Sequence, residues 1–516
     1  MSSAIITPAG KPGKVFAPDQ TASRQPSRVP AATCNTQPGP DARPVPVLPN
    51  DAPASSFACP KHTKAQGSPP SAAKLHRTTF TTSRLLDFAS EKELTAQTGH
   101  AREDWPLVIL KEAIDNALDA CEEASVQPEV TVVVDDDGII IADNGPGLPA
   151  DTVTNIIDFS VRVSSREAYV SPTRGAQGNA LKAILAIPYV LDSSCGQVEI
   201  TAQGQRHVIM FRADKVRQEP IISYHPEPAQ DASGGTILRV PWPESARSLL
   251  AKSKPRFLSL ARDYTFLNPH LTLVLEWFGE PSIHLRATRS DWVKWLPDDP
   301  TSPHWYRQEE LERLIAAYIS HDQKRGADQS VREFITGFCG LTGTAKQKAV
   351  LAETGLARTH LSALVNNDNH DFDHEIIARL LAAMQQHTKL VKPAALGSIG
   401  KDHIAARFKS LGCRMKSFKY RRQPAVDEDG LPSVIETAFA WRGDQSDAKR
   451  RIITGVNWSP TIVDPFRTLG QANAAGLSAF LEERLAGPDE PIVFLLHCAC
   501  PRVRYTDRGK SAVALE

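Results

Sequence analysis

The sequence predicts an α+β protein in which the folded part follows an N-terminal tail. Three observations indicate this class. An amphipathic helix pattern that starts at Leu107 is followed by two strand patterns that end near Gly147. Strand patterns vanish between about residues 300 and 390, where helical periodicity replaces them. From residue 432 strand and helix patterns alternate again, as in a β–α–β unit with a parallel pair of strands.

Composition is that of an ordinary globular protein. The chain has 516 residues, of which 41% are hydrophobic and 23% charged, so it is long enough for about three domains. Lys plus Arg and Asp plus Glu both number 59, and any nucleic-acid-binding surface must therefore be local. The sequence has no run near the roughly 20 apolar residues that span a bilayer. Eight cysteines lack disulfide spacing, and the first residues lack a signal peptide's apolar core. We expect a cytoplasmic protein without membrane contact.

Residues 1–75 are expected to form a disordered tail. They hold 14 of the 39 prolines and neither Trp nor Tyr. Such a segment buries too little apolar area to offset the entropy of ordering it. A linear motif for a partner is the alternative.

The helix and the two strands that follow it carry the first polar cluster. Glu112, Asn116 and Asp119 are spaced four and three apart, so they project from one side of the helix. Asp143 follows the second strand and opens the glycine-rich turn DNGPG. Asn116 can offer an oxygen to Mg²⁺, and Glu112 can orient or deprotonate a water that attacks a γ-phosphate. Asp143 can accept a hydrogen bond from a purine amino group.

These residues resemble two motifs of one ATPase superfamily. Glu112-x-x-x-Asn116 is similar to the N-box of the Bergerat-fold (GHKL) ATPases, and Asp143-x-Gly145-x-Gly147 is similar to their adenine-binding box. The segment KEAIDNALDACEEA, followed by ADNGPG, most resembles the B-type subunit of DNA topoisomerase VI. The resemblance implies a Bergerat-fold ATPase sandwich that uses ATP and Mg²⁺. It makes Glu112 the general base and Asn116 the metal ligand.

A third motif follows at residues 173–182. Gly175 and Gly178 open an apolar helix, which is typical of an anion-binding turn. The segment resembles the ATP-lid box S-R-G-Q-Q-G-I-G of the same topoisomerase VI family, although Asn179-Ala180 replaces its apolar-plus-glycine pair. With Asp119 and the adenine box, the nucleotide contacts implied by this resemblance are Arg174, Gly175, Gln177, Gly178, Asn179 and Lys182.

The resemblance also implies a domain division. Three strand patterns within residues 196–243 would complete the ATPase sheet. We expect a Pro-rich tail, an ATP-binding domain, a helical insert of the helix–two-turns–helix kind and a transducer domain, at residues 1–75, 76–299, 300–392 and 393–516.

Two features of the last domain bear on function. Residues 401–422 carry eight Lys or Arg against one Asp, with aromatic residues between them, and this is the densest basic run. It is a candidate for contact with duplex DNA, although a solvated charged face is the alternative. Near the C-terminus, VRYTDRGKSA resembles the family's switch loop, which implies that Lys510 contacts the γ-phosphate. Cys498-x-Cys500 beside His497 could bind a metal, but a buried strand is the favoured interpretation.

The sequence therefore predicts the ATP-binding and hydrolysing subunit of a type IIB topoisomerase-like complex. We expect an ATP-gated homodimeric clamp that acts on duplex DNA with a separate A-type cleaving subunit. The alternative is an ATP-gated scaffold with no strand-passage role, which the short sequence after Lys510 favours. A histidine-kinase-like phosphotransfer enzyme is disfavoured, because His360 and His370 are poor phosphoacceptor candidates.

Overall fold

A computed structural model gives the fold of this protein. The residues it describes are 88–158, 168–175, 180–217, 219–229, 234–366, 371–443, 449–467, 469, 476–506 and 512–513.

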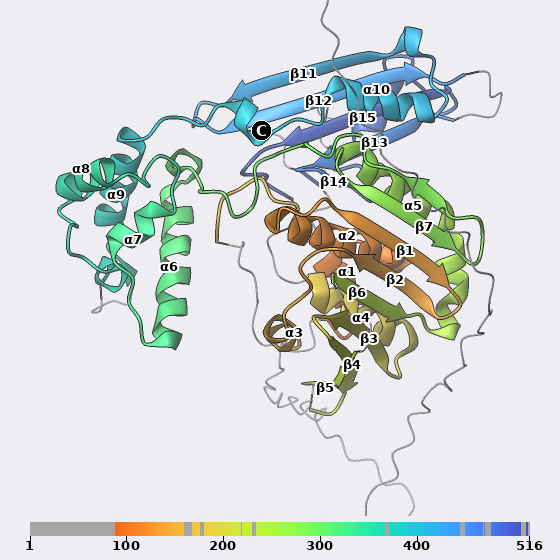
Figure 1. The fold of residues 1–516 in the computed structure, drawn as a ribbon, viewed down its shortest axis with the longest axis horizontal. Helices are drawn as coiled ribbons and strands as arrows, with labels where there is room; N and C mark the ends of the chain where they lie inside the picture. The colour runs from red at the N-terminus through yellow and green to blue at the C-terminus, as the bar shows by residue number, and fades with distance from the viewer. Residues whose placement is uncertain are drawn as a thin grey trace, which may run out of the picture. The chain divides into compact units, whose positions relative to one another are not determined.

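An eight-stranded sheet forms the first half of the described chain (Figure 1). Its strand order is β5-β4-β3-β6-β2-β1-β7-β8. The strands are β1 (Glu129–Asp135), β2 (Gly138–Asp143), β3 (Gly196–Ala202), β4 (Gln205–Asp214), β5 (Glu219–Pro228), β6 (Thr236–Pro241), β7 (Thr272–Trp277) and β8 (Ile283–Leu285). β1 pairs antiparallel with β2 and parallel with β7. Each residue that β1 buries alternates with a more exposed one, which is the predicted period of two.

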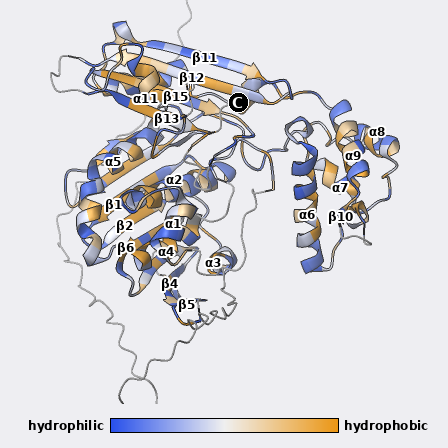
Figure 2. Ribbon diagram, turned by 180° about the vertical axis from the view of Figure 1, so that it is seen from behind, coloured by the Kyte–Doolittle hydropathy of each residue, from blue (hydrophilic) through white to orange (hydrophobic). Residues whose placement is uncertain are grey.

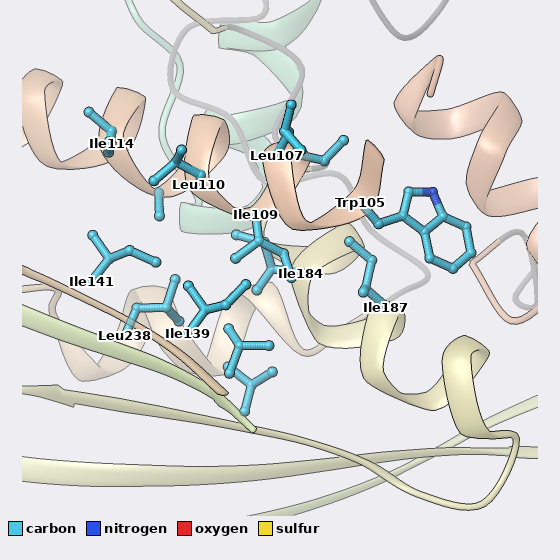
Figure 3. Packing of buried hydrophobic residues seen from close by; sticks show 14 of the residues in the cluster. Trp105, Leu107, Ile109, Leu110, Ile114, Ile139, Ile141, Ile184, Ile187 and Leu238 are labelled. Atoms are coloured by element: carbon cyan, nitrogen blue, oxygen red, sulfur yellow. The ribbon is translucent and has the colours of Figure 1, made fainter. Parts of the chain in front are cut away.

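Helices pack with this sheet in one hydrophobic core. They are α1 (Glu91–Thr98), α2 (Trp105–Glu123), α3 (Ala150–Ile156), α4 (Ala180–Asp192) and α5 (Arg247–Leu267). Figure 3 shows side chains of α2 and α4 meeting Ile139 and Ile141 of β2 and Leu238 of β6. Trp105, at the start of α2, is fully buried in this core.

The N-box helix is longer than its apolar pattern suggests. Pro106 occupies its first turn, where the missing N–H costs nothing. α2 ends at Glu123, and Ser125 takes a left-handed φ of 56°, which an α-helix does not continue through.

Two elements of this half have no clear signal in the sequence. β5 is an edge strand whose residues are mostly exposed, and its prolines at 220, 226 and 228 hide a strand pattern. The 21-residue helix α5 contains Pro255 and many basic residues. A Pro inside a helix usually ends it, and the helical pattern there is therefore obscured.

Four helices follow the first sheet: α6 (Gln308–Arg325), α7 (Val331–Thr336), α8 (Thr344–Thr354) and α9 (His374–Gln386). Gly326 and Gly355 end α6 and α8 in left-handed conformations. Two-residue strands β9 (Val365–Asn366) and β10 (Asp371–Phe372) form a small ladder before α9. Figure 2 shows that α6 is hydrophilic along much of its length, although Leu311, Leu314 and Ile315 are buried.

A five-stranded sheet with order β11-β12-β15-β13-β14 completes the described chain. Its strands are β11 (Lys419–Val426), β12 (Pro432–Trp441), β13 (Arg451–Val456), β14 (Ser459–Pro460) and β15 (Ile492–Ala499), and its helices are α10 (Lys401–Ser410) and α11 (Gly476–Glu482). β13 and β15 are parallel, as the β–α–β pattern predicts. The strand expected around His497 is β15. Within the described ranges no helix has the length and apolarity needed to cross a membrane.

Candidate functional site

A pocket forms where the two sheets and their helices meet. Its lining residues come from the end of α1, the first turns of α2, the segment before α4, and the second sheet with the loop after β15: Thr98, His100, Val108, Lys111, Glu112, Arg174, Gly175, Val456, Ser459, Thr461, Ile462, Val463 and Tyr505. The pocket thus brings together Glu112, the start of the predicted lid at Gly175, and Tyr505 of the predicted switch loop.

The Asp143 turn packs on the other end of the same helix. Asp143 Oδ1 accepts hydrogen bonds from the N–H groups of Gly145 at 2.8 Å and Thr236 at 3.2 Å. Burial raises the pKa of the Asp143 carboxyl, although these two N–H groups oppose the shift. A Cβ on Gly145 would lie 3.3 Å from the Sγ of Cys121 and 3.7 Å from the Cβ of Ala120. The glycine therefore lets this turn approach α2 closely.

Gly147 is required for a different reason. It has a φ of +80°, and a Cβ there would lie 3.0 Å from the carbonyl oxygen of Gly235. Gly235 itself donates its N–H to the carbonyl of Gly145 at 2.9 Å, and any Cβ on it would overlap the carbonyl of Asp143. Gly235 and Thr236 thus shape the turn from β6. Neither residue is predicted from the sequence, where GGTILRVPWP indicates only a strand.

One stripe of α2 connects the two ends of the site. Glu112, Asn116 and Ala120 are spaced four apart, so they follow one face of the helix. Eight residues correspond to about 12 Å along the axis. Asn116, midway, is exposed, and Glu112 is half-buried. An elongated ligand lying along this stripe could reach the Asp143 turn with one end and Glu112 with the other.

Arg174 and Asp119 lie behind this stripe in a buried ion network. Arg174 donates to Asp119 Oδ1 at 2.7 Å, to both oxygens of Glu122 at 2.6 and 2.7 Å, and to the Asn268 amide oxygen at 2.6 Å. Its side chain has no exposed area. The guanidinium and the Asp119 carboxylate face each other in this network, and their nucleotide contacts stay a prediction. These bonds tie the backbone next to Gly175 to α2.

Further charges complete this network. Lys294 Nζ lies 2.9 Å from Glu122 Oε2, and His270 Nε2 lies 3.0 Å from Glu122 Oε1. Burial alone would raise the pKa of Glu122, but Arg174 and Lys294 hold it well below its ordinary value. Paired in this way, the buried carboxylate stays ionised.

The remaining predicted site residues fall into two groups. Lys182 is buried and its ammonium donates to the carbonyl of Asp158 at 2.6 Å, so its proposed place near phosphates stays a prediction. The others lie outside the described residues: Gln177, Gly178, Asn179 and Lys510.

Lys111 is a pocket residue that the sequence motifs do not single out. Its ammonium bonds Asp115 Oδ2 at 2.7 Å and the Ser459 hydroxyl at 2.8 Å. Burial alone would lower the pKa of Lys111, but the carboxylates of Asp115 and Glu112 raise it. The feature of the sequence that could have identified Lys111 is its position directly before the N-box residue Glu112. Its partner Ser459 is not readable from the sequence, because it lies 348 positions away in the chain.

The donor set suits a magnesium ion that arrives with phosphates. Across the described ranges, no cluster of three or more His, Cys, Asp or Glu could hold a metal by itself. Mg²⁺ in nucleotide sites commonly takes one or two protein oxygens and completes its shell with phosphates and water. The exposed amide of Asn116 fits that requirement.

Comparisons with known proteins agree with the two motifs. No family model matches the chain. The B-type subunit of type 2 DNA topoisomerase 6 from Archaeoglobus fulgidus is 24% identical over 425 residues, which cover 79% of this chain and 66% of that protein. Its counterpart from Methanosarcina mazei is 24% identical, covering 79% and 65%. This chain thus spans just under two thirds of the length of these relatives.

Solved structures share low similarity with this fold. The MutL ATPase domain of Aquifex aeolicus, complexed with ADP, has a TM-score of 0.27 at 11% identity and covers 75% of this chain and 90% of its own. The ATPase region of Saccharomyces cerevisiae topoisomerase II has a TM-score of 0.33 at 10% identity and covers 79% and 77%.

A further relative decides the family. The B-type subunit of type 2 DNA topoisomerase 6 from Thermococcus kodakarensis is 30% identical over 478 residues, which cover 83% of this chain and 81% of that protein. The structure, with its two sheets and the helices packed against them, confirms the predicted α+β fold class. The chain belongs to the family of B-type subunits of type 2 DNA topoisomerase 6.

Proposed function

We propose that this chain is the ATP-binding and hydrolysing subunit of a type IIB topoisomerase. The single observation that carries the proposal is the pocket in which Glu112, Gly175 and Tyr505 meet. These residues come from three distant segments, which resemble the family's N-box, ATP-lid box and switch loop. The relatives' name, which makes them B-type subunits of a type 2 DNA topoisomerase, supports the same class of activity.

The α2 stripe suggests how a nucleotide would bind. The base would lie against the Asp143 turn, with the carboxylate accepting a hydrogen bond from the adenine amino group. The triphosphate would run past Asn116 towards Glu112 and the backbone N–H groups near Gly175. A magnesium ion, held partly by the Asn116 amide oxygen, would neutralise phosphate charge when bound. Glu112 would accept a proton from the attacking water.

We further propose an ATP-gated clamp. Lys510 would reach the γ-phosphate from the loop that begins at Tyr505, so that ATP binds the closed form more tightly than ADP does. A ligand shifts such an equilibrium only by its differential affinity for the two states. Two protomers would close on ATP and would act on duplex DNA with a separate cleaving A-type subunit. The predicted domain division at residues 76–299, 300–392 and 393–516 belongs to this proposal.

Glu112→Gln tests the general base. The variant should bind ATP with near wild-type affinity but lose about 10²- to 10⁴-fold in turnover, because a positioned general base contributes a factor of that size. The measurement is steady-state ATP hydrolysis together with equilibrium binding of ATP. Glu123→Gln is the matched control, since Glu123 is exposed at the other end of the same helix. Turnover close to wild type in Glu112→Gln would refute the assigned role.

The same variant tests the clamp. Because it should hold ATP without hydrolysing it, Glu112→Gln should accumulate as a dimer with ATP, measured by sedimentation. A monomer under saturating ATP would contradict the clamp and would leave the alternative of an ATP-binding scaffold. Acceleration of wild-type turnover by duplex DNA separates the two functions further, because only the topoisomerase requires it.

A further inference from the structure

Lys111 stands at the Glu112 end of the pocket. The two residues are adjacent in α2, and both line the cavity. The Lys111 side chain retains 20% of its exposure, and the residue lines the cavity. If Glu112 faces the terminal phosphate, as the proposed function requires, Lys111 lies at that same end.

The ammonium is positioned by bonds on two sides. Asp115 holds it from one turn further along α2, and Ser459 holds it from β14. Asp115 is itself fixed by the Ser459 hydroxyl at 2.7 Å and the Tyr264 hydroxyl at 2.9 Å. Helices α2 and α5 and a strand of the second sheet therefore converge on this one carboxylate.

The hydrogen-bonding capacity of Lys111 leaves room for a ligand. A lysine ammonium has three N–H donors, and its contacts within the described part of the chain use two of them. Arg174, a buried cation that also lines the cavity, differs, because it gives both terminal nitrogens to carboxylate and amide oxygens. Lys111 is thus the better placed of the two to donate to an anion that enters the cavity.

We propose that Lys111 contacts the terminal phosphate of ATP, and that its bond to Ser459 links this contact to the second sheet. The inference rests on the proposed function for the identity of the ligand. It adds a phosphate contact from within α2 to the one expected from Lys510. Since β14 pairs with β13, and β13 pairs with β15, the strand that leads to Tyr505, the contact would join the nucleotide to the sheet that carries the switch loop.

The test compares nucleotides that differ only in the terminal phosphate. In the full chain, Lys111→Gln should weaken binding of a non-hydrolysable ATP analogue about tenfold, because a charge-assisted hydrogen bond is lost, and should leave ADP binding within about twofold. Lys111→Met should give the same change, because it also removes the charge. Lys252→Gln, at an exposed position of α5, is the control and should change neither affinity.

The outcomes separate this inference from the proposed function. If both Lys111 variants keep the wild-type ratio of affinity for the ATP analogue to affinity for ADP, whether both affinities are unchanged or both fall equally, the role of Lys111 is overturned. A wild-type chain that binds neither nucleotide would overturn the proposed function itself.

Discussion

At the scale of single residues, the carboxylates of the site differ in their burial and in their hydrogen-bond partners. Glu122 is buried and paired with cations, so it stays ionised. Asp143 is partly buried, and one oxygen is occupied by two backbone N–H groups. That arrangement fixes the orientation of the carboxylate, and in the proposed function its second oxygen accepts the hydrogen bond from the adenine amino group. Base recognition is therefore the property that a change at Asp143 should affect first.

Asp143→Asn tests this role. The amide can present an N–H where the carboxylate presents an acceptor, so the hydrogen bond from the adenine amino group is lost or replaced by repulsion. We expect ATP affinity to fall at least tenfold, since a hydrogen bond to a charged group contributes about 1.5–3 kcal/mol. Affinity for GTP, which carries a carbonyl at that position, should fall much less. Competition binding measures both, with the exposed Asp151→Asn as control. Equal losses for the two nucleotides would contradict base recognition.

At the scale of elements, local patterns predict much of the site, whereas its long-range contacts leave no trace in the sequence. The N-box, the adenine box and their helix and strands depend on spacings of two to four residues, which sequence periodicity records. The lid motif predicts a nucleotide contact for Arg174 because this residue adjoins Gly175. The hydrogen-bond partners of Arg174 lie in α2 and after α5, 52 to 94 positions away in the chain. Pairings of that kind follow from the tertiary fold alone. For the same reason the sequence could not indicate Ser459.

The packing of α10 against α5 leads to a prediction at the scale of elements. His403 on α10 lies with Nε2 3.0 Å from the carbonyl oxygen of Phe266, and it contacts the Thr288 hydroxyl through Nδ1. Burial and nearby Arg407 lower the pKa of His403 from 6.5 to about 4. The unfolded chain therefore binds more protons between these values, and the folded state loses stability as pH falls from 6.5 towards 4.

His403→Gln should remove this part of the pH dependence. Relative to its value at pH 7.5, the wild-type free energy of unfolding should fall at pH 5 by about 2 kcal/mol more than that of the variant, because one pKa unit corresponds to about 1.4 kcal/mol. Urea unfolding at the two pH values measures the difference. Burial also lowers the pKa of His207 and His270, so the comparison between the two proteins is what isolates His403. Parallel pH profiles would show that α10 is not held by the neutral imidazole.

At the scale of the whole molecule, the basic run predicted at residues 401–422 divides between two elements. Part of it lies in α10, where Arg407 is buried and donates to the carbonyls of Thr265 and Arg286. The rest reaches β11, an edge of the five-stranded sheet. Lys419, Arg421 and Arg422 are exposed there. Cations on an edge strand discourage pairing with other strands, and they also offer a surface to a phosphate backbone.

Replacing all three β11 cations by Gln distinguishes these two roles. If β11 contacts duplex DNA, the affinity should fall for all sequences alike, because phosphate contacts carry no sequence information. The slope of log affinity against log salt should become shallower by about 2 to 3, since each neutralised phosphate contributes about 0.9. The control replaces three exposed cations of the first half of the chain, Arg217, Arg247 and Lys252. An unchanged slope in the β11 variant, with aggregation at low salt, would instead mean that the cations only protect the edge of the sheet.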